Sequence, residues 1–409
     1  DARMTHAIHD FGAKLRQPGA APTLEAYVNW RRSVRDARAA GDATPPAPDL
    51  APVSINLDLT TACNFKCTHC IDWDILNSKP RLDMDDLRAS LRRMSEHGLR
   101  SVILIGGGEP TVHPGFVELV AYLKQLELSV AIVSNGSRGE RLLEVAPMLT
   151  KGDWIRLSLD SGSNELFEAM HLPNDKSVTL DVICSWIPKI RAANPDVTVG
   201  FSYVVVWKGA SREENAIHEN IHEMFLAAER AREAGFHYIG YKPVLERQAD
   251  GAEVMDPERA ANHVTEVASR IRAEVERARA LESGDFSVYE SINLRLLESG
   301  DWRQATLQPK TCHMQALRQV LSPMGAYNCP AHRGVDKARL GDAGNWATDE
   351  GAARAGEHLA TILDEFDASH ECAQVTCLYH GVNWWIEDLI ADADAPAIPM
   401  GAEAGDYFL

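Results

Sequence analysis

The chain has 409 residues, of which 45% are hydrophobic and 24% are charged, a composition typical of a globular protein. This length exceeds what one hydrophobic core organises, so we expect two packed units. A formal net charge of −18 argues against nucleic acid as a partner. The apolar stretches are too short to span a bilayer, and no apolar signal core is evident. We therefore expect a cytoplasmic protein without a membrane partner.

The pattern changes along the chain from helical to alternating strand and helix and then to short, irregular segments. Five regions are predicted: a helical extension and linker (1–50), an α/β core (51–250), a helical connector (251–304), a cysteine-rich domain (305–390) and a tail (391–409). The core contains six predicted strands: Val53–Leu59, Ser101–Ile105, Ser129–Ser134, Trp154–Asp160, Val197–Val206 and Tyr238–Val244. Helical stretches between them predict parallel βα units that form a partial or full barrel.

Polar residues alternate with apolar ones along two of these strands. In the first, Asn56 and Asp58 alternate with apolar neighbours, and in the fourth Arg156, Ser158 and Asp160 do the same. Because covering helices need an apolar face, the polar residues are expected to point into the barrel and to line a ligand chamber. The alternative is an edge strand with one solvent-exposed face.

Eight cysteines in a chain of this kind favour metal ligation over disulfides. Three of them, Cys63, Cys67 and Cys70, follow the first predicted strand in a Cys-x3-Cys-x2-Cys pattern. Three thiolates in one loop can hold three irons of a [4Fe-4S] cluster and leave the fourth iron open. The alternative is a zinc site that takes His69 or a distant residue as its fourth ligand.

The cysteine pattern resembles the signature of the radical S-adenosylmethionine (SAM) superfamily. Gly106-Gly107-Gly108-Glu109-Pro110, which follows the second strand, is similar to that family's Gly-Gly-Glu-Pro motif. The resemblance implies a partial (β/α)6 barrel, a [4Fe-4S] cluster on the three cysteines, and SAM bound through its amino group by Gly106 to Glu109. The alternative for this segment is a tight turn before the next helix.

Other positions match the family less sharply. Ser134 and Asn135 after the third strand, and Ser158 at the end of the fourth, resemble segments that line the SAM and substrate sites, while His69 is expected near the adenine. The acid or base of turnover is chosen from position alone, and the candidates are Asp160, Tyr203, Lys242, Asp72, Asp74 and Glu246.

Four further cysteines lie in the 305–390 region: Cys312, Cys329, Cys372 and Cys377. The segment from Cys312 to Cys329 resembles the opening of the auxiliary-cluster domains called SPASM and twitch. Four cysteines fit the twitch form, which carries one auxiliary [4Fe-4S] cluster. The spacing between Cys372 and Cys377 is wider than in that family, so His370 or His380 is an alternative last ligand, and structural zinc is the alternative metal. Cys184 is expected to be a small buried residue.

The resemblance implies a radical SAM enzyme that receives one electron from flavodoxin or ferredoxin and abstracts hydrogen from its substrate. We expect a small polar metabolite, such as a sugar, a cyclitol or a nucleotide-like molecule, and dehydrogenation or rearrangement as the outcome. Peptide maturation of the SPASM type is the alternative. A non-catalytic iron-sulfur electron carrier is the alternative from another class.

Overall fold

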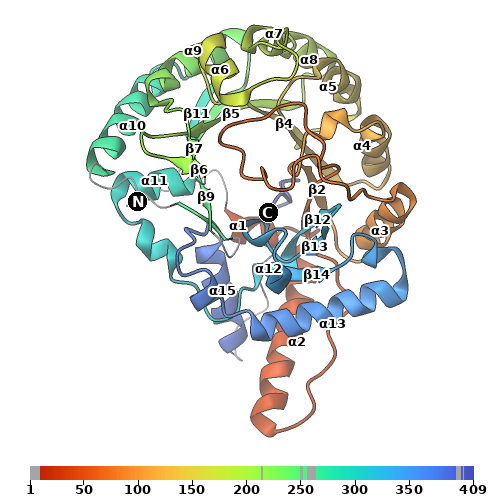
Figure 1. Ribbon diagram of the computed structural model, residues 1–409. Coiled ribbons are helices and arrows are strands. Elements are labelled where there is room, and N and C mark those ends of the chain that lie inside the picture. The colour runs from red at the N-terminus through yellow and green to blue at the C-terminus, as the bar shows by residue number, and fades with distance from the viewer. Residues whose placement is uncertain (1–9, 213–214, 249–251, 256–263, 393–397, 399) are drawn as a thin grey trace.

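The computed structural model describes residues 10–212, 215–248, 252–255, 264–392, 398 and 400–409. Its centre is a ten-stranded sheet in the order β11-β8-β5-β4-β3-β2-β1-β12-β13-β14. The strands are β1 (Ser54–Leu57), β2 (Ser101–Leu104), β3 (Ser129–Ser134), β4 (Trp154–Ser158), β5 (Thr198–Val205), β8 (Tyr238–Pro243), β11 (Ser287–Glu290), β12 (Arg318–Ser322), β13 (Gly325–Tyr327) and β14 (Arg339–Gly341). The sheet curves into an open barrel, with the chain's C-terminus inside the arc (Figure 1).

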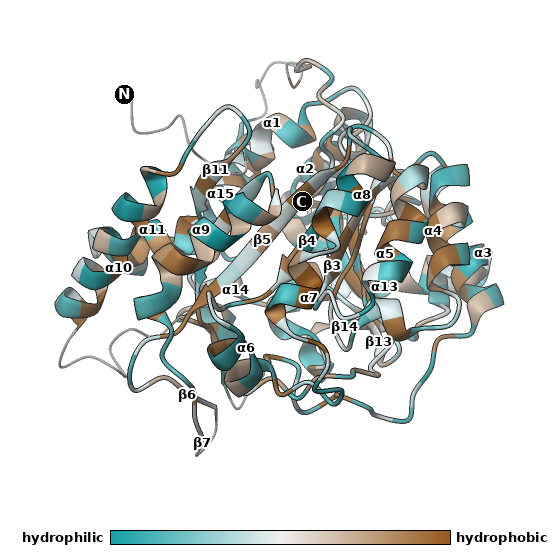
Figure 2. Ribbon diagram, turned by 90° about the horizontal axis from the view of Figure 1, so that it is seen from above, coloured by the Kyte–Doolittle hydropathy of each residue, from teal (hydrophilic) through white to brown (hydrophobic). Residues whose placement is uncertain are grey.

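All six strands predicted for the core are present, and each pairs in parallel with its neighbour. The helices of this region are α3 (Met84–Glu96), α4 (Phe116–Gln125), α5 (Gly139–Val145), α6 (Asn164–His171), α7 (Leu180–Cys184), α8 (Ile187–Ala193) and α9 (Met224–Ala234). They surround the outside of the arc (Figure 1) and present polar residues outward (Figure 2). The α/β fold expected from the sequence is therefore confirmed.

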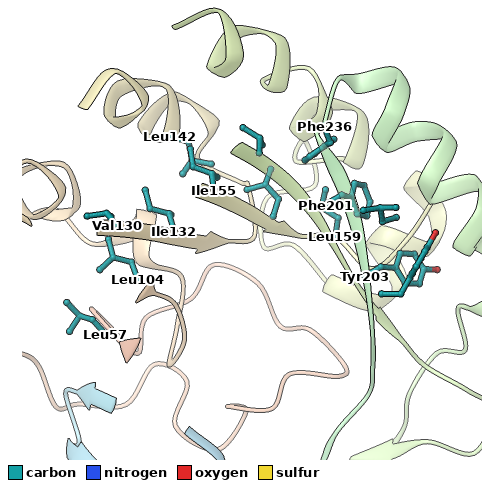
Figure 3. Close-up of a cluster of buried hydrophobic side chains, with 14 of the residues drawn as sticks. Leu57, Leu104, Val130, Ile132, Leu142, Ile155, Leu159, Phe201, Tyr203 and Phe236 are labelled. Carbon is teal, nitrogen blue, oxygen red and sulfur yellow. The ribbon is translucent and has the colours of Figure 1, made fainter. Parts of the chain in front are cut away.

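The main hydrophobic core lies between the sheet and this outer helix layer. Ile55, Leu57, Ile155, Leu157 and Phe201 belong to it, and all are at most 1% exposed. Figure 3 shows such side chains standing between strands and helices. The alternate residues of the same strands face the inside of the arc. The predicted polar inner face follows from this alternation.

The connector predicted as helical also contains a strand. Helices α10 (Val264–Arg279) and α11 (Ile292–Ser299) lie on either side of β11, which pairs in parallel with β8. The helical prediction for this connector was therefore wrong at Glu253–Val254 and at Ser287–Glu290, and its residues 251 and 256–263 lie outside the described residues. This segment is a strand because it pairs with β8. Ser287–Glu290 is too short for its own sequence pattern to identify a strand.

The cysteine-rich region joins the same sheet. Strand β12 pairs in parallel with β1, and β13 and β14 continue antiparallel from it. The other helices here are α12 (Met314–Leu317), α13 (Asp349–Glu365), α14 (Ala368–Glu371) and α15 (His380–Ala391). Two further two-stranded sheets are separate from the ten-stranded one: β6 (Ser211–Arg212) with β7 (Asn215–Ala216), and β9 (Glu246–Arg247) with β10 (Glu253–Val254).

The N-terminal helices pack on the cysteine-rich region. Helices α1 (Phe11–Leu15) and α2 (Ala21–Ala40) share a second hydrophobic core with residues of α12 and α15. Tyr27 Oη lies 2.8 Å from His313 Nδ1, next to Cys312. The first nine residues of the predicted extension lie outside the described residues. Within the described part of the chain, no helix has the length and apolarity needed to cross a membrane.

The described part of the tail packs against the inner face of the sheet. Phe408 is 3% exposed and packs with Ile103, Ala131 and Val133 on the inner face of the sheet. Its carbonyl accepts a hydrogen bond from Lys14 Nζ at 2.7 Å. Residues 393–397 and 399 of the predicted tail lie outside the described residues.

Candidate active site

The three-cysteine loop leaves β1 at its carboxyl end, and its sulfurs are half-buried. Burial raises the pKa of Cys63 to about 11, and burial together with Cys70 and Cys63 raises the pKa of Cys67 well above its ordinary value. Neighbouring thiols of this kind stay protonated until a metal displaces the protons. This donor set fits a thiolate-bound metal centre.

The glycine motif lies against the start of the cysteine loop. Gly107 has a positive φ of 78° and forms a β-bridge with Thr60. A Cβ on Gly108 would come within 2.2 Å of the Ala62 carbonyl oxygen. The backbone N–H of Glu109 donates to that same oxygen at 2.9 Å. Glycine is needed here because two loops make backbone contact.

Glu109 is 3% exposed, and its carboxylate is fixed by hydrogen bonds from three residues. Oε1 accepts from Ser134 Oγ at 2.8 Å and from Thr111, and Oε2 accepts from the Asn135 N–H at 2.7 Å. Burial nevertheless raises the pKa of Glu109. Within the described residues, this buried carboxylate has no cationic side chain among its hydrogen-bond donors, which suits an ammonium ligand.

Asp160 and two histidines form a second buried group at the ends of the strands. Asp160 Oδ2 lies 2.9 Å from His69 Nε2 and 3.5 Å from His171 Nε2, and Oδ1 accepts from the Val204 N–H at 2.6 Å. Burial alone would raise the pKa of Asp160, but the His69 hydrogen bond and the two histidines hold it below its ordinary value. Asp160 is therefore an oriented carboxylate.

The histidines connect this group to the cysteine loop. His171 Nδ1 lies 3.2 Å from Cys67 Sγ, and burial lowers the pKa of His171 to about 4. His69 Nδ1 is buried and has no hydrogen-bond partner among the described residues. His69, which the sequence analysis expected near the adenine, is hydrogen-bonded to Asp160 through Nε2, and its Nδ1 remains able to bond to a ligand.

Tyr203 does not share this site. It is fully buried in the main core beside Tyr241, and its hydroxyl donates to the Asn220 carbonyl at 2.6 Å. Strand alternation places it opposite Val204, on the face that the helices cover (Figure 3). The prediction of a catalytic role for Tyr203 was wrong, because it ignored this alternation.

Lys242 and Ser158 do lie on the inner face. Val204 is the register partner of Lys242 and lies beside Asp160, whereas Ser158 pairs with Ser202. Burial lowers the pKa of Lys242 to about 8, with a further contribution from the charge of Arg156. Lys242 therefore can exchange a proton near neutral pH.

The four remaining predicted ligands surround one cavity of about 130 Å³. Cys312, Cys329, Cys372 and Cys377 all line it. Burial raises the pKa of Cys329 to about 12, and neighbouring thiols add to the same upward shift at Cys372 and Cys377. A four-thiol cavity of this kind fits a metal cluster.

The histidine beside this cavity is not one of those considered from the sequence. His332 lines the cavity, and its Nε2 lies 3.6 Å from Cys372 Sγ. His370 and His380 are absent from the lining of this cavity, and His370 is exposed. The suggestion that either replaces a cysteine ligand is therefore not supported by the geometry.

An ion cluster joins the two cysteine regions. Arg333, which follows Cys329 by four residues, contacts Asp58 at the end of β1 and Asp72 in the three-cysteine loop. Glu253 interacts with the same charges, and burial raises the pKa of Glu253 to about 7. Sequence reasoning missed His171, Arg333 and Glu253, since none lies in a motif and the fold alone brings them to the site.

Comparisons with known proteins agree with this geometry. The family model described as "Radical SAM superfamily" matches residues 57–221, which include the three-cysteine loop and Glu109. Residues 57–221 are a radical SAM domain. Members of that superfamily use a [4Fe-4S] cluster and SAM.

Curated relatives match over part of their length. Mycofactocin maturase MftC of Mycobacterium tuberculosis is 35% identical over 144 residues, which are 31% of this chain and 34% of that protein. An S-adenosylmethionine-dependent nucleotide dehydratase of a Thermoplasmatales archaeon is 36% identical over 26% of this chain and 38% of its own. The chain thus spans about a third of the length of these relatives.

Solved structures share the fold over a larger part of the chain. Streptococcus suis SuiB matches with a TM-score of 0.54 and 13% identity, over 87% of this chain and 77% of SuiB. The anSMEcpe structure with bound AdoMet matches with a TM-score of 0.51 and 15% identity, over 78% and 82% of the two chains. At such identities the likeness concerns the fold.

Proposed function

We propose that this enzyme binds its [4Fe-4S] cluster on Cys63, Cys67 and Cys70, binds SAM beside it, and carries one auxiliary [4Fe-4S] cluster in the four-cysteine cavity. Those three cysteines would hold the cluster, which with SAM, and with one electron from an external donor such as flavodoxin or ferredoxin, would supply the 5′-deoxyadenosyl radical chemistry of hydrogen abstraction from the substrate. The observation that carries this proposal is the contact of the cysteine loop with the segment that ends in Glu109.

Each polar group at the strand ends has a distinct task in this proposal. Glu109 accepts the ammonium group of SAM, which compensates the cost of burying its carboxylate. His69 and Asp160 order the floor of the SAM site, and His69 Nδ1 is available to the ligand. Lys242 faces the substrate and holds or releases a proton at Nζ, because its pKa is near 8.

We further propose a small polar metabolite as the substrate, and dehydrogenation or rearrangement as the outcome. The support is the charged and hydroxyl-bearing inner face around Arg156, Ser158 and Lys242. The second candidate is peptide modification. It is favoured by the relative named mycofactocin maturase and by the SuiB structure described as bound to its precursor peptide.

The test compares three variants with the parent after anaerobic reconstitution. We expect about eight irons in the parent, about four after Cys63→Ala/Cys67→Ala/Cys70→Ala, and about four after Cys312→Ala/Cys329→Ala. Cys184→Ala, a buried cysteine of α7, is the control and should keep about eight. 5′-Deoxyadenosine should form with reductant and SAM in the parent and the control, and not in the triple variant.

The same assay separates the alternatives. A parent that holds iron but never forms 5′-deoxyadenosine under any reductant would be an electron carrier. Retention of zinc by the four-cysteine cavity would remove the auxiliary cluster from the proposal. Stimulation of 5′-deoxyadenosine formation by a peptide fraction, and not by a small-metabolite fraction, would favour peptide modification.

A further inference from the structure

Two cations, Arg156 on β4 and Lys242 on β8, occupy the inner face of the sheet. Arg156 is in register with Gly200 of β5 and Tyr238 of β8. Lys242 stands four residues further along β8 than Tyr238, on the same face because side chains alternate with a period of two. The charge of Arg156 contributes to the lowered pKa of Lys242. The two cations therefore act on each other.

Neither cation forms an ion pair within the part of the chain that the structure describes. Arg156 stacks on the Trp154 ring at 5.1 Å, and its buried Nε has no hydrogen-bond partner there. Lys242 senses the charges of Asp160 and Glu253 but lies within 4 Å of neither carboxylate. Asp160 is already bound by His69 and by the Val204 N–H.

In the described part of the chain, the buried lysine and the buried arginine, Lys14 and Arg333, are paired with carboxylates. Lys14 lies 3.0 Å from Asp406, Arg333 contacts two aspartates, and the half-buried Lys124 lies 2.6 Å from Asp153. Burying an unpaired cation costs several kcal/mol, so pairing is the normal solution. Arg156 and Lys242 are half-buried on the inner face without such a partner in the described residues, and an anionic ligand would compensate both charges.

The row between the two cations consists of small residues. Ser158, Ser202 and Gly240 are in register across β4, β5 and β8. A Cβ on Gly240 would meet its nearest neighbour, the Tyr238 ring, only at 3.6 Å. In the row below, Tyr238 lies across Gly200, where a Cβ would approach its ring within 2.1 Å. Because these side chains are small, space remains above the strands between Arg156 and Lys242.

We infer that Arg156 and Lys242 bind an anionic group of the substrate, a phosphate or a carboxylate, above the row of Ser158, Ser202 and Gly240. This inference rests on the proposed function, because it assigns these residues to the substrate side of the same site. Arg156 offers a planar fork of N–H donors, and Lys242 adds a point charge, a combination that suits oxyanions. The two serine hydroxyls can donate to the same group.

The test measures protection of Lys242 in the reconstituted holoenzyme. An amine with a pKa near 8 reacts with an acylating reagent faster than ordinary surface lysines do, and peptide mass spectrometry locates the product. Inorganic pyrophosphate and succinate serve as probes, one for phosphates and one for carboxylates. We expect one of them to protect Lys242, and titration calorimetry to give the same affinity as the protection.

Arg156→Gln should lower the affinity for the probe that protects Lys242 by about ten- to a hundredfold, because one charge-assisted interaction is lost. Arg88→Gln, which removes an exposed arginine on α3, is the control and should bind as the parent does. Protection that is equal in Arg156→Gln and the parent, or no binding of either probe, would overturn the inference. 5′-Deoxyadenosine formation by the parent is measured in parallel, so failure of the proposed function is recognised separately.

Discussion

Arg333 Nη1 donates to both carboxylate oxygens of Asp58, at 3.0 and 2.9 Å. Nη2 of the same guanidinium lies 2.6 Å from Asp72 Oδ1. One side chain from the four-cysteine region thereby fixes the end of β1 and the three-cysteine loop. The two cysteine sites are therefore mechanically connected through a buried ion cluster.

Arg333→Met should lower the free energy of unfolding by about 3–5 kcal/mol, because Asp58 and Asp72 stay buried without their cation. Urea denaturation followed by circular dichroism measures this. Arg339→Met, which removes an exposed arginine paired with exposed Asp342, is the control and should cost less than about 1 kcal/mol. Equal losses of unfolding free energy in the two variants would show that the buried ion cluster stabilises the protein no more than an exposed ion pair does.

Glu109→Gln should weaken SAM binding by about ten- to a hundredfold, since a neutral amide replaces the carboxylate that accepts the ammonium group. Equilibrium dialysis with labelled SAM checks the affinity, and an iron count checks that the cluster is retained. Glu127→Gln, on a surface turn after α4, should leave the affinity unchanged. Normal SAM affinity in Glu109→Gln would contradict the assigned role.

Tyr203→Phe should leave 5′-deoxyadenosine formation unchanged and lower the free energy of unfolding by about 1–3 kcal/mol. The variant loses the hydroxyl that satisfies the buried Asn220 carbonyl. Thermal denaturation and the SAM cleavage assay measure the two quantities separately. A large loss of cleavage in a folded Tyr203→Phe protein would return this residue to the site.

Binding of the anionic probe should fall as the pH rises through about 8, because Lys242 loses its charge there. Arg156, Asp160 and Glu253 also face this amine. The pKa of Lys242 in the folded protein, about 8, lies below its ordinary value of 10.5. Between these two pH values the unfolded chain binds more protons than the folded protein. The contribution of Lys242 to the free energy of unfolding therefore rises with pH from about 8 to 10.5. Comparison with Lys242→Met, which should lack both dependences, isolates the effect.

Phe408→Ala should destabilise the protein by about 3 kcal/mol or more, because a buried ring on the inner face is lost. Chemical denaturation provides the measurement. Met400→Ala, at a tail position that is 68% exposed, should change stability by less than about 0.5 kcal/mol. A small effect of Phe408→Ala would mean that the tail is not part of the stable core.

The six core strands could be predicted because each carries enough local alternation or apolar character to stand out. The three-cysteine loop and Glu109 could be located because sequence motifs follow strand ends directly. Strand β11 could not be found, since only its partner β8 distinguishes Ser287–Glu290 from the helices around it.

The remaining site residues depend on contacts between distant parts of the chain. His171 reaches Cys67 from helix α6, and Arg333, in the segment after β13, reaches Asp58 although 275 residues separate them. No local pattern marks either residue. Tyr203 was misassigned for a different reason. Its position near the end of β5 suggested a place in the site, but its side chain lies on the face of the strand that packs in the core.

The pairing of β1 with β12 also bears on the order in which the molecule can be assembled. Asn56 and Arg318 are hydrogen-bonded although 262 residues separate them. During synthesis, β1 can pair with β2 early, but its other edge must wait until the cysteine-rich region has emerged. An unpaired edge of this kind invites intermolecular strand addition. Fragments that end before β12 are thus expected to aggregate, even though they contain every residue of the radical SAM motif.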